Sequence, residues 1–196
     1  GLALKKAGGR LQERQVPLIG VTAAFIFAAQ MINFPVAGGT SGHFLGAALA
    51  AILLGPLMSV LIMSLVLIAQ CLGFADGGLT ALGTNIFNMG IVAGGGGYLV
   101  FAALRKILPR SNSSFMAAAA IASWMSVALA SGFCALELAL SGTSPFPLVF
   151  PAMVGVHAII GIGEGLITAA VASMVLKFRP DLIAGYKLQP ALEGTK

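Results

Sequence analysis

The segment HFLGAALAAILLGPLMSVLIMSLVLIAQCLGF, residues 43–74, carries no Lys, Arg, Asp or Glu and is too long for one simple membrane crossing. A bilayer core of about 30 Å needs roughly 20 apolar residues, whereas this segment would reach about 48 Å at about 1.5 Å per residue. Gly55-Pro56 lies within it, and proline disfavours helix at the residue before it. We expect two helices separated at Gly55, the first one short, and a single kinked helix is the alternative.

The rest of the chain has the same apolar character. Of its 196 residues, 58% are hydrophobic and 9% are charged, whereas soluble domains carry roughly 25% charged residues; the mean hydropathy is +0.99. The other long uncharged runs are 16–34, 79–104, 114–140 and 148–176. These runs predict an all-α fold, a polytopic transmembrane bundle of six helices, with one domain over 1–178 and a cytoplasmic tail over 179–196.

The basic residues fall into three clusters between the apolar runs. The clusters are Lys5, Lys6, Arg10 and Arg14; then Arg105, Lys106 and Arg110; then Lys177, Arg179, Lys187 and Lys196. Six spans place all three clusters on one side, which the positive-inside rule makes cytoplasmic. Because the clusters form no single patch, the net charge of +5 indicates topology and not nucleic-acid binding.

The start of the sequence suggests a further helix. GLAL followed by KKAGGR is typical of the last turn of an apolar helix ending at a basic cytoplasmic loop. We therefore expect a seventh helix before Gly1, which would place its amino terminus on the outer face.

Polar side chains concentrate in the outer half of this topology, where they are costly unless they face the bundle interior. They are Gln30, Asn33, His43, Gln70, Asp76, Asn85, Asn88, Glu137 and His157, with Glu164 about halfway down its helix. A pore would need polar groups through its full depth, so the pattern predicts a cup that opens outward. Imidazoles and amides without Lys or Arg form a donor set suited to a divalent transition metal.

Individual residues allow more than one interpretation. We favour His43 as a metal ligand, with a polar anchor at the membrane surface as the alternative. Asn85 and Asn88 share a helix face and would either support a ligating histidine or hold the loop containing Asp76. His157 and Glu164, seven residues apart, also share a face; an interhelical hydrogen bond is favoured for them, and metal binding is the lesser interpretation.

Catalytic and nucleotide-binding motifs are absent from the sequence. AGGGGYL, residues 93–99, lacks the Gly-Lys-Ser/Thr of a phosphate loop, and neither HExxH nor GxSxG occurs. The sequence therefore predicts no enzymatic activity and no cofactor, with any ATP hydrolysis on a separate partner. Two alternatives stay open: an intramembrane metal-dependent enzyme using His43, His157 and Glu164, and a capture subunit for an organic vitamin.

Three blocks carry a family resemblance: FPVAGGTSGHFLGAALAAILLGP at 34–56, FADGGLTALGTNIFNMG at 74–90 and HAIIGIGEGLIT at 157–168. Together they resemble the CbiM/NikM family, the substrate-capture subunits of energy-coupling-factor cobalt and nickel transporters, over about residues 14–177. The resemblance implies transport of Co(II) or Ni(II) in a bacterial or archaeal inner membrane. It also implies a CbiQ-like transmembrane coupling subunit, CbiO-like ATPases and a small CbiN-like accessory membrane protein as partners.

The resemblance further implies how the metal is held. In that family an amino-terminal Met-His segment supplies an amine, a backbone nitrogen and an imidazole, and a histidine in the glycine-rich block completes the site. That second histidine matches His43. Four nitrogens in a plane suit Ni(II) or Co(II) and disfavour Mg(II) and Ca(II), which prefer oxygen ligands. The sequence from Gly1 contains no such Met-His segment, so we expect His43 to complete a site begun by another segment.

Overall fold

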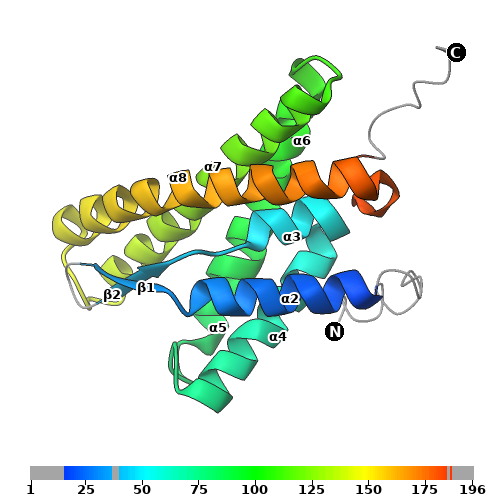
Figure 1. The fold of residues 1–196 in the computed structure, drawn as a ribbon. Coiled ribbons are helices and arrows are strands. Elements are labelled where there is room, and N and C mark those ends of the chain that lie inside the picture. The colour runs from blue at the N-terminus through cyan, green and yellow to red at the C-terminus, as the bar shows by residue number, and fades with distance from the viewer. Residues whose placement is uncertain (1–15, 37–39, 185, 187–196) are drawn as a thin grey trace, which may run out of the picture.

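The computed structural model describes residues 16–36, 40–184 and 186. Its elements are α2 (Val16–Gln30), β1 (Asn33–Val36), β2 (Thr40–His43), α3 (Ala47–Leu54), α4 (Pro56–Phe74), α5 (Leu82–Asn85), the π-helix η2 (Ile86–Gly96), α6 (Gly97–Ile107), α7 (Asn112–Leu140), α8 (Phe146–Phe178) and the 3-10 helix η3 (Pro180–Leu182) (Figure 1). The expected helix before Gly1 and the basic cluster at residues 5–14 lie outside the described residues.

The described part of the chain is a polytopic helical bundle, as the sequence predicts. Four of its helices are long and apolar enough to cross a membrane: Pro56–Phe74, Leu82–Ile107, Asn112–Leu140 and Phe146–Phe178. The helix Leu82–Ile107 is continuous and consists of α5, η2 and α6. The 15-residue α2 and the eight-residue α3 are shorter, and they bring the helical segments of the described chain to the six predicted.

The helix break at Gly55 is confirmed. α3 ends at Leu54, and α4 begins at Pro56. Proline is well suited to the first position of a helix, because an N–H at that position would have no intrahelical acceptor. Gly55 adopts φ 93°, a left-handed value that residues with a Cβ rarely take. The two residues therefore end one helix and begin the next without an intervening loop.

The short helix α3 lies in the centre of the bundle. Every one of its residues is buried, and it packs against α4, η2, α6 and α7. Close approach requires small residues: a Cβ added at Gly97 would lie 2.8 Å from Ser126 Cβ and 3.1 Å from Ala48 Cβ. Gly94 and Gly97, at the two ends of the glycine run, thus allow close helix packing.

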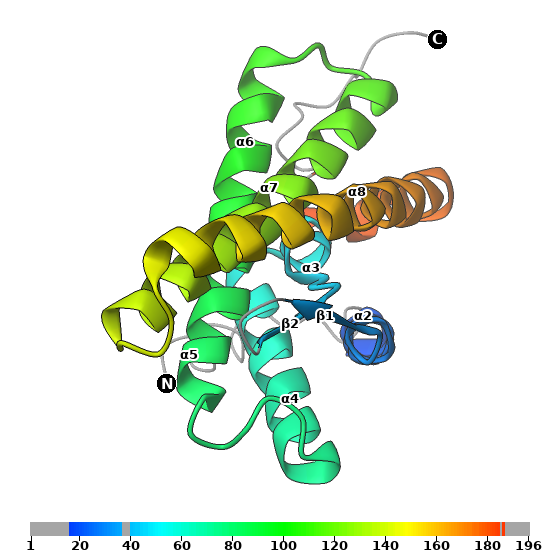
Figure 2. The ribbon, with the colours of Figure 1, turned by 90° about the vertical axis from the view of Figure 1, so that its left-hand side faces the viewer.

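An antiparallel hairpin changes two of the predicted boundaries. The run 16–34 is helical only to Gln30, and the helix expected from His43 begins at Ala47. Between them β1 pairs with β2, with Asn33 opposite His43. Pro35 disfavours helix at the residue before it, so the apolar run continues as a strand. The hairpin adds two short strands to the all-α expectation, and Figure 2 views the bundle from the end that carries it.

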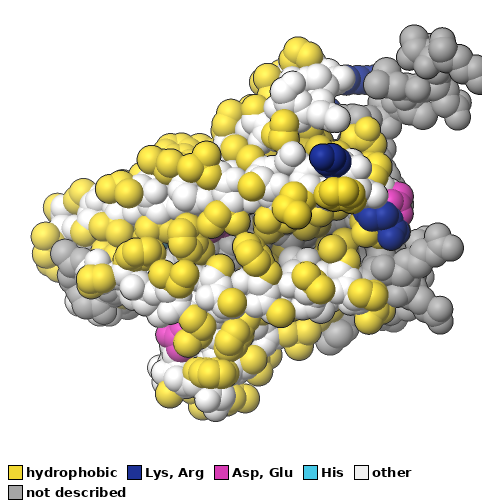
Figure 3. All heavy atoms as spheres, in the orientation of Figure 1, with side chains coloured by type: hydrophobic (Ala, Val, Ile, Leu, Met, Phe, Trp, Pro, Cys, Tyr) yellow, Lys and Arg dark blue, Asp and Glu magenta, His cyan; other side chains and the backbone are white. Residues whose placement is uncertain are grey.

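The described basic residues lie at the end of the bundle opposite the hairpin. They are Arg105, Lys106, Arg110, Lys177 and Arg179, at the last turns of α6 and α8 and in the segments that follow them. The Lys and Arg side chains visible in Figure 3 gather at that end. Along α8, Lys177 is roughly 30 Å from His157 at about 1.5 Å per residue. The second and third basic clusters, as far as they are described, thus share one side.

The segment after α8 returns to the bundle. α8 ends at Phe178, where the sequence places the domain boundary. Ile183, which follows η3, is completely buried within the main hydrophobic core, and the Tyr186 ring lies 6.2 Å from the Phe115 ring between centroids. The start of the predicted tail therefore packs on the helices.

Gly46 provides a test of the packing at the start of α3. It adopts φ 70°, and an added Cβ would lie 2.6 Å from Ile26 Cγ1, whereas Gly78 has φ 68° and open space around its Cβ position. Left-handed backbone costs a non-glycine residue about 1–2 kcal/mol at either position, and overpacking adds about 1–3 kcal/mol at Gly46. We expect Gly46→Ala to lower the thermal unfolding midpoint in detergent well below that of Gly78→Ala. Equal midpoints for the two variants would contradict the contact with Ile26.

Candidate metal centre

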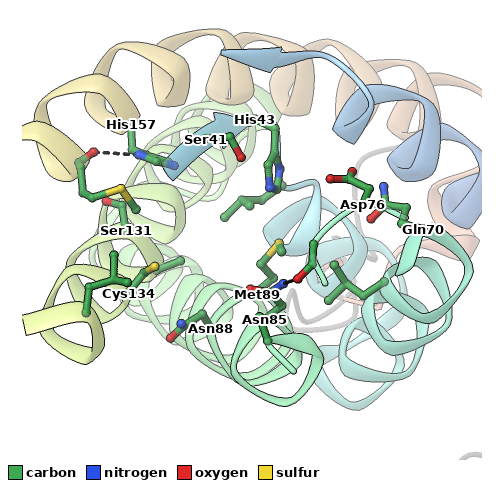
Figure 4. A pocket seen from close by; sticks show the side chains of 17 residues that line it. Ser41, His43, Gln70, Asp76, Asn85, Asn88, Met89, Ser131, Cys134 and His157 are labelled. Carbon is green, nitrogen blue, oxygen red and sulfur yellow. Dashed lines mark hydrogen bonds between the residues drawn. The ribbon is translucent and has the colours of Figure 1, made fainter. Parts of the chain in front are cut away.

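A cavity of about 330 Å³ opens at the hairpin end of the bundle, between β2, α4, the loop before α5, η2, α7 and α8. Its polar lining residues are Ser41, His43, Gln70, Asp76, Asn85, Asn88, Ser131 and His157 (Figure 4). Six of these belong to the polar set that the sequence assigns to an outward cup. The remaining members of that set, Gln30, Asn33 and Glu137, do not line the cavity.

His43 presents one ring nitrogen to this cavity. Its Nδ1 lies 2.9 Å from the carbonyl oxygen of Phe44. Because a carbonyl oxygen only accepts hydrogen bonds, Nδ1 carries the proton and Nε2 carries the lone pair. The ring points into the middle of the surrounding side chains (Figure 4). His43 Nε2 is therefore the nitrogen available to a metal ion.

His157, on α8, is fixed in the same way. Its Nδ1 lies 2.7 Å from the carbonyl oxygen of Met153, one turn earlier on α8, so its Nε2 also carries the lone pair. A Cβ added at Gly42 would lie 3.4 Å from this Nε2. The imidazole of His157 therefore lies against the backbone of β2 at Gly42, the residue before His43.

Glu164 lies outside the cavity lining and contacts the backbone that follows His43. Its Oε2 accepts a hydrogen bond from the N–H of Leu45 at 2.9 Å, and its Oε1 accepts one from the N–H of Gly46 at 2.6 Å. From the other side, Gln30 Nε2 donates to the carbonyl oxygen of Leu45 at 2.8 Å. Side chains of α2 and α8 thus hold the segment between the hairpin and α3.

The two asparagines hold loops and helices. Asn85 Nδ2 donates to the carbonyl oxygen of Gly77 at 3.3 Å, beside Asp76, and Asn88 Nδ2 donates to Glu137 Oε2 at 2.6 Å. Neither forms a hydrogen bond to a histidine within the described residues. The contact of Asn85 is that of the loop-support interpretation, whereas Asn88 joins η2 to α7. Asp76 lies at the cavity wall beside Gln70 (Figure 4).

The sequence interpretation missed several lining residues. They are Ser41, Met89, Ser131, Cys134 and Met153, besides apolar residues. Ser131 and Cys134 are three residues apart, so they share a face of α7, but both stand in an apolar run where small residues normally indicate packing. Three of the missed side chains bring sulfur, which is a soft ligand, close to the two imidazoles.

The three residues of the enzyme alternative do not form one site. Both oxygens of Glu164 are bonded to backbone N–H groups, whereas His43 and His157 line the cavity. Within the described residues no group of three or more His, Cys, Asp and Glu side chains could hold a metal ion. Within the described residues, the two imidazoles thus line the cavity without belonging to such a group.

Fold and cavity together define a small polytopic membrane protein with a polar cavity at one end. The family described as "Cobalt uptake substrate-specific transmembrane region", CbiM, matches residues 1–182. The chain belongs to this family, as the three sequence blocks indicate.

Relatives across archaea and bacteria agree with this assignment. A protein of Archaeoglobus fulgidus, provisionally named as a fused nickel transport protein NikMN, is 48% identical over 87% of the chain, which spans 57% of that relative's length. The cobalt transport protein CbiM of Geobacter sulfurreducens is 35% identical over 86% of the chain and 49% of its own length.

Solved structures share the fold. A crystal structure of a transition metal transporter has a TM-score of 0.83 and 30% identity, covering 98% of the chain and 89% of its own. The S component of a bacterial ECF transporter has a TM-score of 0.61 at 20% identity, covering 86% and 98%. The second likeness concerns the fold alone.

The protonation of the two rings can be measured directly. The chain has two histidines, so histidine-selective ¹⁵N labelling gives the signals of two imidazoles. At about pH 8 we expect protonated Nδ1 and unprotonated Nε2 in both rings of the metal-free protein. A ring that carries its proton on Nε2 instead of Nδ1 would contradict the carbonyl contacts described above.

Proposed function

We propose that this chain is the membrane substrate-capture subunit of an ATP-driven energy-coupling-factor transporter that takes up Co(II) or Ni(II). The observation that carries the proposal is His43, whose Nε2 lone pair faces a polar cavity at one end of the bundle. Membership of the cobalt uptake family supports it. The proposal concerns transport, and the chain itself performs no reaction.

The ligand chemistry supports a nitrogen-preferring cation. His43 supplies one imidazole nitrogen, and a Met-His amino terminus would supply an amine, a backbone nitrogen and a second imidazole. Four nitrogens around one ion suit Ni(II) and Co(II), whereas Mg(II) and Ca(II) require oxygen ligands in greater number. The cavity of about 330 Å³ beside His43 leaves space for such a segment.

The charge distribution supports the orientation. The described basic residues lie at the end opposite the cavity, and Lys and Arg near membrane spans stay cytoplasmic. The cavity then opens to the outside of a bacterial or archaeal cell membrane. Energy would come from CbiO-like ATPases through a CbiQ-like coupling subunit, with a CbiN-like accessory protein, because the sequence has no nucleotide-binding motif.

Other cavity residues would assist His43. Asn85 holds the loop that carries Asp76, and Asn88 joins η2 to α7 through Glu137. We assign Asp76, Asn85 and Asn88 to shaping the cavity. His157 would add a second nitrogen donor from α8, since its Nδ1 is already bonded to Met153.

Substitution of His43 tests the metal site. We expect His43→Ala, in the full-length protein with its native amino terminus, to weaken Co(II) and Ni(II) binding about 100-fold or more, because loss of an outer partner alone costs about 10–100-fold. Isothermal titration calorimetry measures the affinities. Ser131→Ala, which alters another cavity-lining side chain, serves as the control. Equal affinity of His43→Ala and the unaltered protein would reject the proposed role.

Substitution of His157 tests the second donor. His157→Phe keeps an aromatic ring on α8 but removes both nitrogens. We expect a change in the visible absorption spectrum of bound Co(II), which reports its ligands, with a loss of affinity smaller than that of His43→Ala. An unchanged spectrum together with an unchanged affinity would restrict His157 to packing against Gly42.

A further inference from the structure

The peptide group between Phe44 and Leu45 is hydrogen-bonded on both sides. Its carbonyl oxygen accepts from His43 Nδ1 at 2.9 Å. Its N–H donates to Glu164 Oε2 at 2.9 Å. The bond is trans, so the carbonyl and the N–H point in opposite directions from one rigid plane. The plane therefore links the imidazole on one side to the carboxylate on the other.

This arrangement extends a known feature of metal sites. A ligating histidine usually donates its second ring N–H to a carboxylate or a carbonyl, which fixes its tautomer and orientation. At His43 the carbonyl is present, and the carboxylate stands one peptide group further away. Hydrogen bonds that share a peptide group strengthen one another, because an acceptor at the N–H increases the negative charge on the carbonyl oxygen, which then binds its own donor more strongly.

Glu164 suits this position because it can hold two N–H groups at once. Its second oxygen accepts from the N–H of Gly46 at 2.6 Å, at the start of α3, where the positive end of the helix dipole favours a carboxylate. The side chain is 3% exposed. Because the carboxylate is shielded from water, its two oxygens bind these backbone N–H groups alone, which fixes the peptide plane in one orientation.

We propose that Glu164 is a positioning residue for His43: through the Phe44–Leu45 peptide group it fixes the imidazole that presents Nε2 to the metal ion. The inference rests on the proposed function. It assigns to α8 a role in metal binding that involves no contact between Glu164 and the ion.

The test compares two variants of α8. Glu164→Gln keeps the shape but replaces one acceptor oxygen by an NH₂ donor, which opposes one of the two backbone N–H groups. Thr168→Val is the control: it removes a buried contact of 2.8 Å to Ser123 Oγ on α7, one turn further along the helix. We expect Glu164→Gln to weaken Co(II) and Ni(II) binding about 10–100-fold and Thr168→Val to bind like the unaltered protein.

The outcomes separate this inference from the proposed function. If the unaltered protein binds the ions and His43→Ala does not, unchanged affinity in Glu164→Gln overturns the positioning role alone. A loss equal to that of Thr168→Val also overturns it, because the effect would then follow from general weakening of the helix pair. If His43→Ala binds as tightly as the unaltered protein, the proposed function itself fails.

A second measurement decides the question even if Glu164→Gln does not fold. Phe44–Leu45 is the only Phe-Leu pair in the sequence, so ¹³C-carbonyl phenylalanine with ¹⁵N leucine labels this one peptide group. In metal-free His43→Ala the carbonyl loses its donor, and we expect both the Phe44 carbonyl and the Leu45 amide signals to shift. Unchanged signals would show that the imidazole and the peptide group are not connected, and would overturn the inference.

Discussion

The structure depends on a rule of the bilayer: backbone N–H and C=O groups at membrane depth must find partners within the protein. The segment between β2 and α3 belongs to neither element, so regular secondary structure does not provide hydrogen-bond partners for all of its backbone groups. Glu164 accepts from the N–H groups of Leu45 and Gly46, and Gln30 donates to the carbonyl oxygen of Leu45. Without these side chains, an irregular backbone next to the cavity would be too costly to keep.

The late start of α3 creates the site. A helix beginning at His43 would use that residue's backbone in its first turn, whereas the observed helix begins at Ala47 and leaves His43 on a strand at the cavity wall. The eight residues that remain form a helix too short to cross the membrane, and it is stable only because longer helices surround it completely.

Sequence reasoning found those features that have local signals. Gly55-Pro56 marks a helix break by its own chemistry, and a polar residue in an apolar run is visible wherever it stands, so the six helical segments and six of the polar lining residues were predicted correctly. The hairpin was missed because Phe34 and its neighbours continue an apolar run. The bond from Glu164 to Leu45 was missed because it joins a side chain to a backbone group across 119 positions, and any residue at position 45 other than proline would offer the same N–H.

A comparison of the two histidines shows why His43, unlike His157, requires a carboxylate to hold the peptide group that it contacts. Each donates its Nδ1 proton to a backbone carbonyl. For His157 that carbonyl belongs to Met153, inside α8, where the surrounding helix already fixes the peptide plane. For His43 it belongs to Phe44, outside any helix or strand, so the plane is free to rotate unless a third group holds its N–H. Glu164 is that group, and the imidazole of His43, the last residue of β2, thereby acquires the rigidity that an imidazole on a helix has from the start.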